Sequence, residues 1–206
     1  MYIPTESEFL GGIRLYDQRE RRGPVYFEAL RLIQEGWGDA LAVADGIGRL
    51  LKSWHLNFYR FGMYAQDKLE DCLSENLAVL DAIHERSTAS LGQEDEEMIR
   101  SLFGQFTTAL RGGKHGQRES TVATAKAMHL LAPDFLPLWD TSIASVYGQL
   151  PMFAGNYVAF CWQMRDFAAA TTAYIVKPDD RTLLKRVDEF NYSAYTTHWI
   201  DVGGTS

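Results

Sequence analysis

Asp140 and Lys126 are the side chains whose chemistry first suggests a reaction. Both lie in the stretch 120–148, which reads STVATAKAMHLLAPDFLPLWDTSIASVYG. A carboxylate can stabilise a developing positive charge or assist an attacking water. A lysine amine can instead act as a nucleophile and form a Schiff base. The pair therefore makes this stretch the first candidate for an active site.

Two helices joined by a tight turn are predicted to position these side chains. Ser120 suits the N-cap of the first helix, and apolar side chains follow at helical spacing. Pro133 ends that helix, and Pro137 keeps the next residues extended. Asp140 then stands at the N-cap of a second helix, which Gly148 ends. The residues alone favour a capping role for Asp140, a role that is compatible with catalysis.

The segment Pro137-Leu138-Trp139-Asp140-Thr141 resembles the core of the helix-hairpin-helix DNA glycosylases. In that family a hairpin, a helix and a short loop lead to Pro-apolar-apolar-Asp, and the Asp is the catalytic carboxylate. The resemblance covers about a fifth of the chain. It implies an all-α, two-lobed fold, a cleft for an extruded nucleotide, and Asp140 as the carboxylate that helps to hydrolyse the N-glycosidic bond in DNA.

The hairpin departs from the family pattern. A Gly-x-Gly hairpin is usual there, but none stands immediately before Ser120, and the nearest candidate is Gly112-Gly113-Lys114-His115-Gly116. The hairpin is therefore expected to be remodelled or displaced.

The family's Schiff-base lysine also has no direct counterpart. Counting back from Asp140 puts its position near Thr121 or Val122, and Lys126 lies about one turn further into the helix. Lys126 could reach the cleft, pair with Asp140 or point to solvent. The missing lysine favours a monofunctional hydrolase over a lyase, with Lys126 kept as a candidate catalytic residue.

Two further segments supply the predicted contacts with DNA. The loop 111–118 carries three cations before Glu119, so phosphate contacts are expected there. The predicted DNA-binding residues are Arg111, Gly113, Lys114, His115, Gln117, Arg118 and Thr121. The aromatic segment 57–64 could wall a base pocket, because flat rings stack on any base. The predicted pocket residues are Asn57, Tyr59, Arg60, Tyr64 and Trp139. A solvated loop and an aromatic core are the alternative interpretations.

The charge balance bears on the substrate. The net charge is −7 and the pI is about 5.2, so general binding to DNA is expected to be weak at cellular salt. A weak binder suits DNA in which the target base is abundant, such as a viral genome with modified bases throughout. Repair of damaged bases is the rival hypothesis. A catalytically silent helical module that binds nucleic acid or protein is the alternative to an enzyme.

The length and patterning predict one all-α domain of 206 residues. Residues 66–148 are expected to form a central lobe, and residues 1–65 with 149–206 a second lobe. Residues 1–23 look irregular because of their glycines, Pro4 and mixed charges. Gly46-Ile47-Gly48 lies within a predicted helix, where close helix packing is a better explanation than nucleotide binding.

The remaining composition excludes several classes of protein. Cys72 and Cys161 are expected to be buried free thiols in a reducing cytosol, and two cysteines exclude a four-cysteine iron–sulfur cluster. The histidines lack metal-ligand spacing, so we expect neither metal nor cofactor, and a buried, hydrogen-bonded role for His129. Without a signal peptide or a membrane-length apolar run, a cytoplasmic monomer with no membrane partner is expected.

Overall fold

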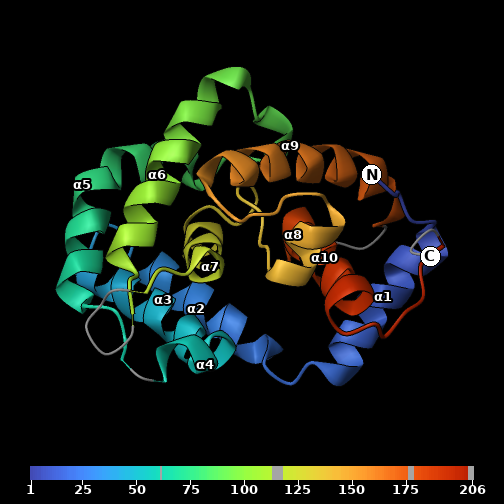
Figure 1. Ribbon diagram of the computed structural model, residues 1–206, viewed down its shortest axis with the longest axis horizontal. Coiled ribbons are helices and arrows are strands. Elements are labelled where there is room, and N and C mark those ends of the chain that lie inside the picture. The colour runs from blue at the N-terminus through green and yellow to red at the C-terminus, as the bar shows by residue number, and fades with distance from the viewer. Residues whose placement is uncertain (61, 113–117, 176–178, 204–206) are drawn as a thin grey trace.

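The chain folds into helices and short turns (Figure 1). The computed structural model describes residues 1–60, 62–112, 118–175 and 179–203. The α-helices are α1 (Glu6–Arg19), α2 (Gly23–Glu35), α3 (Ala40–Trp54), α4 (Leu56–Tyr59), α5 (Gln66–His84), α6 (Glu96–Ala109), α7 (Thr121–Leu131), α8 (Thr141–Val146), α9 (Ala154–Thr171) and α10 (Leu183–Asn191). The described residues form no strand beyond an isolated bridge between Gly112 and Arg118. The predicted all-α class is therefore confirmed.

Several helices begin and end at the residues that the sequence indicates. The Asp39 carboxylate accepts a hydrogen bond from the Leu41 amide (3.0 Å) at the start of α3. Ser120 accepts one from the Ala123 amide (3.1 Å) at the start of α7. Each side chain satisfies an amide that has no partner within its helix. These caps fix where the elements of the candidate site begin.

The expectation of an irregular N-terminal segment is wrong, because residues 6–19 form α1. Thr5 and Glu8 make a capping box, in which each side chain bonds the other's backbone amide. A Cβ on Gly12 would lie 2.8 Å from the Phe190 ring, so the glycine lets α1 approach α10 closely. The Thr-x-x-Glu spacing was the signal in the sequence for this helix.

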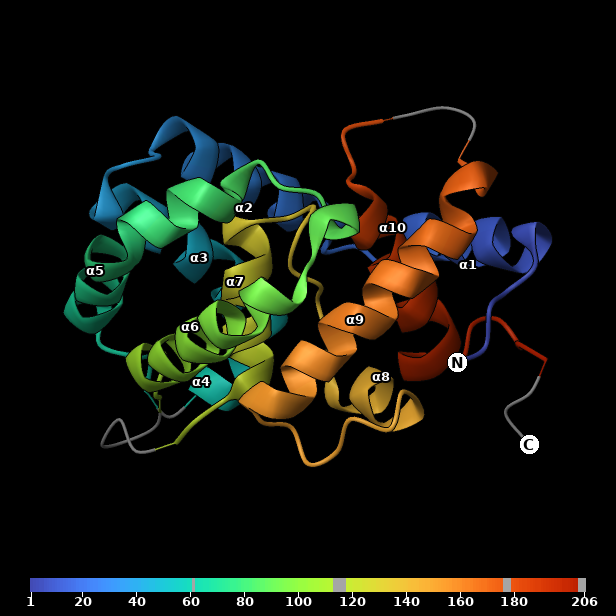
Figure 2. The ribbon, with the colours of Figure 1, turned by 90° about the horizontal axis from the view of Figure 1, so that it is seen from above.

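Helices that are far apart in the sequence pack on each other, as neighbouring helices do. Helices α2 and α3 pack on each other and also contact α7, and α3 contacts α5. Helix α1 packs on α10, and α9 contacts both α6 and α10 (Figures 1 and 2). A Cβ on Gly46 would lie 2.6 Å from Ile33, which confirms close helix packing as the role of that glycine. Thus α2 and α3 lie against the middle helices, and α1 lies against α10. The expected division into two lobes stays a prediction.

An aromatic cluster holds the segment that leads to Asp140. Trp139 is only 1% exposed and packs against Phe103, Tyr157 and Phe160. The Tyr157 hydroxyl donates to the Pro137 carbonyl (2.8 Å). These contacts fix the backbone on the N-terminal side of the Asp140 carboxylate.

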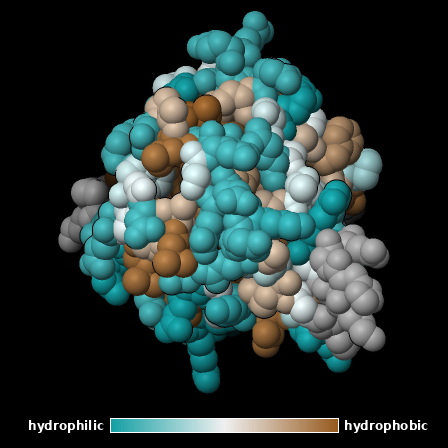
Figure 3. Space-filling view, turned by 90° about the vertical axis from the view of Figure 1, so that its left-hand side faces the viewer, coloured by the Kyte–Doolittle hydropathy of each residue, from teal (hydrophilic) through white to brown (hydrophobic). Residues whose placement is uncertain are grey.

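The surface beside α5 is mostly hydrophilic, with small separate hydrophobic patches (Figure 3). None of the helices in the described ranges combines the length and apolar character that crossing a bilayer requires.

Candidate active site

A polar pocket of about 210 Å³ lies where α7 and α8 meet the junction of α1 with α2 and the face of α10. Its lining residues are Tyr16, Glu20, Arg22, Trp54, Lys126, Leu138, Trp139, Asp140, Ile143, Asp188 and Tyr192. The pocket therefore brings together Asp140 and Lys126, the two predicted catalytic residues, and the nearly buried Trp139 forms part of its wall. It adds side chains from α1, α3 and α10 that the sequence did not indicate.

Asp140 is both a helix cap and a wall of the pocket. Its Oδ1 accepts a hydrogen bond from the Ile143 amide (2.8 Å), as expected for the N-cap of α8. Its Oδ2 accepts one from the Thr196 hydroxyl (2.6 Å), in the π-helical turn that follows α10. One donor on each oxygen holds the Asp140 carboxylate in one orientation.

Lys126 reaches the same pocket from α7. Its Nζ donates to the Trp54 carbonyl (3.1 Å) and lies 5.8 Å from the centre of the Trp54 ring. Burial lowers the pKa of Lys126 to about 8, although the charges of Asp140 and Asp188 act to raise it. The amine is therefore mostly charged at neutral pH and loses its proton slightly above it. The Lys126 ammonium therefore interacts with the charges of both carboxylates.

One rim of the pocket is a small network of polar side chains. Arg22 binds Glu20 (2.7 Å) and donates to the Tyr192 hydroxyl (3.0 Å), and that hydroxyl donates to Glu20 (3.1 Å). The hydrogen bonds from Arg22 lower the pKa of Glu20 to about 2. The network ties the junction of α1 and α2 to the turn after α10. Arg22 is thereby held at the rim of the pocket.

Arg111, Arg118 and Thr121, which are the predicted DNA-binding residues that the structure describes, do not line the pocket. Gly113, Lys114, His115 and Gln117 fall outside the described residues. Arg111 forms an ion pair with Glu119, and the Arg118 guanidinium lies 5.2 Å from the centre of the Phe58 ring. Thr121 opens α7, and its carbonyl accepts from the Trp139 indole (3.3 Å).

The aromatic segment 57–64 does not line the pocket either. Tyr59 and Tyr64 are buried against each other, with ring centres 5.6 Å apart, and Tyr59 donates to the Leu110 carbonyl (2.9 Å). Asn57 and Arg60 are exposed. The structure therefore places the two tyrosines in the core. Trp54, just before this segment, supplies the aromatic wall.

The other reactive side chains that the sequence singled out have structural places. His129 is buried, its Nδ1 lies 2.7 Å from the Leu136 carbonyl, and its Nε2 lies 2.8 Å from the Tyr26 hydroxyl. Cys72 and Cys161 are buried free thiols. Within the described ranges, His, Cys, Asp and Glu side chains do not gather into a group that could hold a metal ion.

Two other hollows differ in chemistry from the polar pocket. A small one of about 110 Å³ between α3 and α5 is lined mainly by apolar side chains such as Leu73 and Leu77. A groove of about 550 Å³ lies on the other side of Tyr16, and its acidic and basic lining residues include Arg181 and Glu189. Neither contains Asp140 or Lys126.

The fold and the pocket define an all-α protein with a compact, charge-lined site. Comparison of the chain with protein-family models, curated proteins and solved structures found no match.

Proposed function

We propose that this protein is a DNA glycosylase, which hydrolyses the N-glycosidic bond of a damaged or modified base and leaves an abasic site. The observation that carries the proposal is that Asp140, Lys126 and Trp139 line one pocket. Hydrolysis of this bond needs a carboxylate near the sugar, a donor near the leaving base and a site that admits one extruded nucleotide. At about 210 Å³ the pocket is smaller than those that hold drug-sized ligands, and it suits a single base and its sugar.

Asp140 is suited to stabilise positive charge on the sugar. The C1′–N bond breaks with its electron pair moving to the base, so positive charge develops at C1′. A carboxylate whose two oxygens are already held needs little reorganisation when that charge appears. In this proposal the protonated Lys126 donates a hydrogen bond to the base as negative charge develops on it.

The charges of the pocket favour a base and a sugar over a phosphate. Three carboxylates, from Glu20, Asp140 and Asp188, line it together with two cations, from Arg22 and Lys126. The hydrogen-bond donors of Asp140 are neutral, so a phosphate beside it would be repelled, whereas a sugar cation would be stabilised. Phosphates are therefore assigned to the outside, where Arg118 is the proposed contact. Lys114, the other predicted contact, falls outside the described residues.

We propose hydrolysis without strand cleavage. The position that holds the nucleophile in the lyase branch of the resembling family carries no lysine here, and Lys126 donates to a main-chain carbonyl. Borohydride is therefore expected to trap no covalent adduct between protein and DNA. Efficient trapping that disappears in Lys126→Ala would make Lys126 a nucleophile.

The decisive experiment compares Asp140→Asn with Asp39→Asn. Asn is nearly isosteric with Asp and caps helices well, and Asp39 caps α3 without lining the polar pocket. Asp140→Asn should slow single-turnover base release by at least about a hundredfold and leave DNA binding intact. Asp39→Asn should release the base at the wild-type rate. An equal rate in the Asp140 variant would refute the assignment.

The substrate panel separates repair from defence. It contains oligonucleotides with oxidised, alkylated or deaminated bases, and DNA fully substituted with modified cytosine. Release only from the single lesions would support repair, and release only from the substituted DNA would support defence against viral genomes. Binding without release from any substrate would instead favour the catalytically silent module.

A further inference from the structure

Asp188 is a second carboxylate in the pocket, and it comes from a part of the chain far from Asp140. It lies on α10, its side chain is 10% exposed, and it lines the same pocket as Asp140 and Lys126. Its charge and that of Asp140 both act on the Lys126 amine. The two carboxylates therefore face one small space from different sides of the fold.

The hydrogen bonds of the two carboxylates differ. Asp140 has a donor on each oxygen, the Ile143 amide and the Thr196 hydroxyl. Asp188 receives a hydrogen bond on Oδ2 from Lys185 Nζ (3.0 Å), and its Oδ1 takes none from the described part of the chain. An oxygen without a protein donor has room to accept a proton from a water in the pocket.

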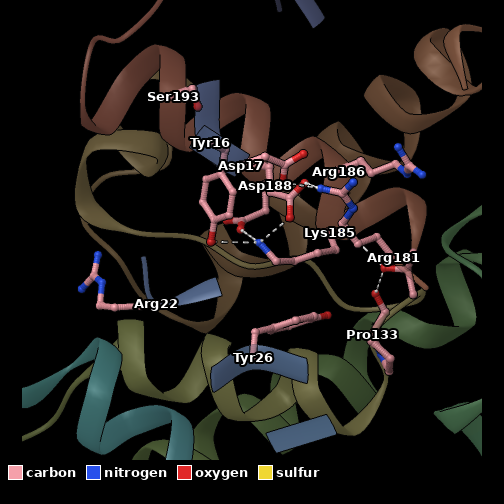
Figure 4. A network of polar contacts seen from close by, with 12 residues as sticks. Tyr16, Asp17, Arg22, Tyr26, Pro133, Arg181, Lys185, Arg186, Asp188 and Ser193 are labelled. Atoms are coloured by element: carbon pink, nitrogen blue, oxygen red, sulfur yellow. Dashed lines mark hydrogen bonds and ion pairs between the residues drawn. The ribbon is translucent and has the colours of Figure 1, made fainter. Parts of the chain in front are cut away.

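A buried lysine fixes the orientation of Asp188. Lys185 is 1% exposed, and its Nζ also lies 3.3 Å from Glu189 and 3.4 Å from the Tyr16 hydroxyl (Figure 4). Burial alone would lower the pKa of Lys185, but Asp188 and Glu189 outweigh it and raise the pKa well above its usual range. Lys185 thus stays charged and holds Asp188 by one oxygen, which leaves the other for a ligand.

We propose that Asp188 is the general base that activates the attacking water, while Asp140 stabilises the sugar cation. This inference rests on the proposed glycosylase activity and divides its two tasks between two side chains. A role as general base also explains why a carboxylate of α10 lines a pocket whose predicted catalytic residues both come from the stretch 120–148.

The proposed step balances as a hydrolysis. The C1′–N bond breaks, and its electron pair moves to the nitrogen of the departing base. A water oxygen forms the new bond to C1′, and its proton passes to Oδ1 of Asp188. The base takes up one proton, from the Lys126 ammonium or from solvent, and Asp188 returns its proton to solvent. Where Lys126 supplied the proton, it takes one back from solvent. The sum is one water added across one glycosidic bond.

Glu189 provides a matched control for Asp188. It is the next residue on α10 and binds the same lysine, yet it lines the groove beyond Tyr16 and not the polar pocket. Its second oxygen accepts from Arg181 (3.1 Å), so both of its oxygens are occupied. Glu189→Gln and Asp188→Asn each remove one negative charge from the same buried cluster. A purely structural role for Asp188 predicts that the two variants behave alike.

The test is single-turnover base release at saturating DNA, with thermal melting and DNA affinity measured on the same preparations. We expect Asp188→Asn to slow release by about a hundredfold or more, and Glu189→Gln by less than about fivefold. Equal losses in the two variants, or a wild-type rate in Asp188→Asn, would overturn the inference and leave the proposed function standing. A wild-type protein that releases no base would instead remove the proposed function itself.

Chemical rescue distinguishes a general base from a structural residue, because added formate should restore base release only if Asp188 acts as a base. Asp188→Ala leaves space in the pocket beside Lys185, and added formate can take the place of the missing carboxylate. Formate should raise base release by Asp188→Ala by at least about tenfold, with no effect on wild type or on Asp140→Ala. If Asp188→Ala unfolds, the Asn variant still decides the question. Folded Asp188→Ala that formate does not accelerate would contradict a base role.

Discussion

The two carboxylates of the pocket belong to regions that are built in different ways. Asp140 lies between α7 and α8, and neutral donors occupy both of its oxygens. Asp188 lies on α10, and a buried ammonium holds one oxygen only. Identical side chains in one pocket are thereby prepared for different tasks, because the groups around each decide which of its oxygens a ligand can use.

The longest contact of each region joins it to a different part of the chain. The cap of α8 joins residues three apart, Asp140 and Ile143. The contact of Lys185 with Tyr16, which completes the surroundings of Asp188, joins residues 169 positions apart. Asp140 also accepts from Thr196, 56 positions away, and Asp188 accepts from Lys185, three positions away. Each region therefore joins a local contact to a distant one, and the surroundings of Asp188 are complete only when α1 packs on α10.

The largest expected effect is on stability, from Lys185→Met. Removal of this ammonium leaves Asp188 and Glu189 buried without their shared cation, which should cost roughly 3–5 kcal/mol. Thr196→Val removes a neutral donor from Asp140 and should cost only about 1–3 kcal/mol. Urea unfolding of both variants measures the difference.

The double variant Lys185→Met with Glu189→Gln should recover part of the lost stability, because one buried charge disappears with the cation. Equal costs for Lys185→Met and Thr196→Val would show that the ammonium and the hydroxyl hold their carboxylates equally, and the contrast between the two regions would fail.

The next effect is on activity and concerns the Lys126 amine, which interacts with the charges of Asp140 and Asp188. Burial lowers the pKa of Lys126 to about 8, so the ammonium is present below that pH and is lost above it. Base release should therefore fall by about tenfold per pH unit above pH 8. Lys126→Arg should keep its activity there, and Lys126→Met should be slow and insensitive to pH between 7 and 9.

Lys52→Met serves as the matched control, since Lys52 is exposed on α3. It should follow the wild-type pH profile. A wild-type rate that is constant to pH 10 would remove the proposed role of the Lys126 ammonium.

The smallest expected effect is the loss of stability in acid that His129, on the helix before Asp140, should cause. Burial lowers the pKa of His129 to about 3, against about 6.5 in an unfolded chain. Below pH 6.5 the unfolded chain binds a proton that the folded protein does not. Stability should therefore fall by about 1 kcal/mol per pH unit between pH 6 and pH 4.

Burial also lowers the pKa of His55, to about 4. His55 should therefore add a similar loss of stability per pH unit, but over a narrower pH range than His129. Urea midpoints measured across this range give the slope. His129→Asn should lower the stability at pH 7 but make its pH dependence shallower. An unchanged slope in that variant would mean that other groups control the acid response.

Much of the local structure could be predicted from the sequence. Asp39, Ser120 and Asp140 each cap the helix that the apolar spacing indicates, and Gly148 has the positive φ of a helix stop. His129 is buried and hydrogen-bonded as expected. These features depend on backbone hydrogen bonds and periodicity within about a dozen residues, so a short stretch of chain contains the whole signal.

The pocket depends on contacts that no short stretch contains. Its lining residues span Tyr16 to Tyr192, and neither the burial of Tyr59 and Tyr64 nor the access of Asp188 follows from helical spacing. Lys185, Asp188 and Glu189 look like an ordinary charged helix face in the sequence. Only the packing of α1 on α10 turns that face inward, because burial depends on which helix covers it. The sequence by itself therefore determined the helices and placed Asp140 at the start of α8, and the tertiary structure decided which side chains share its pocket.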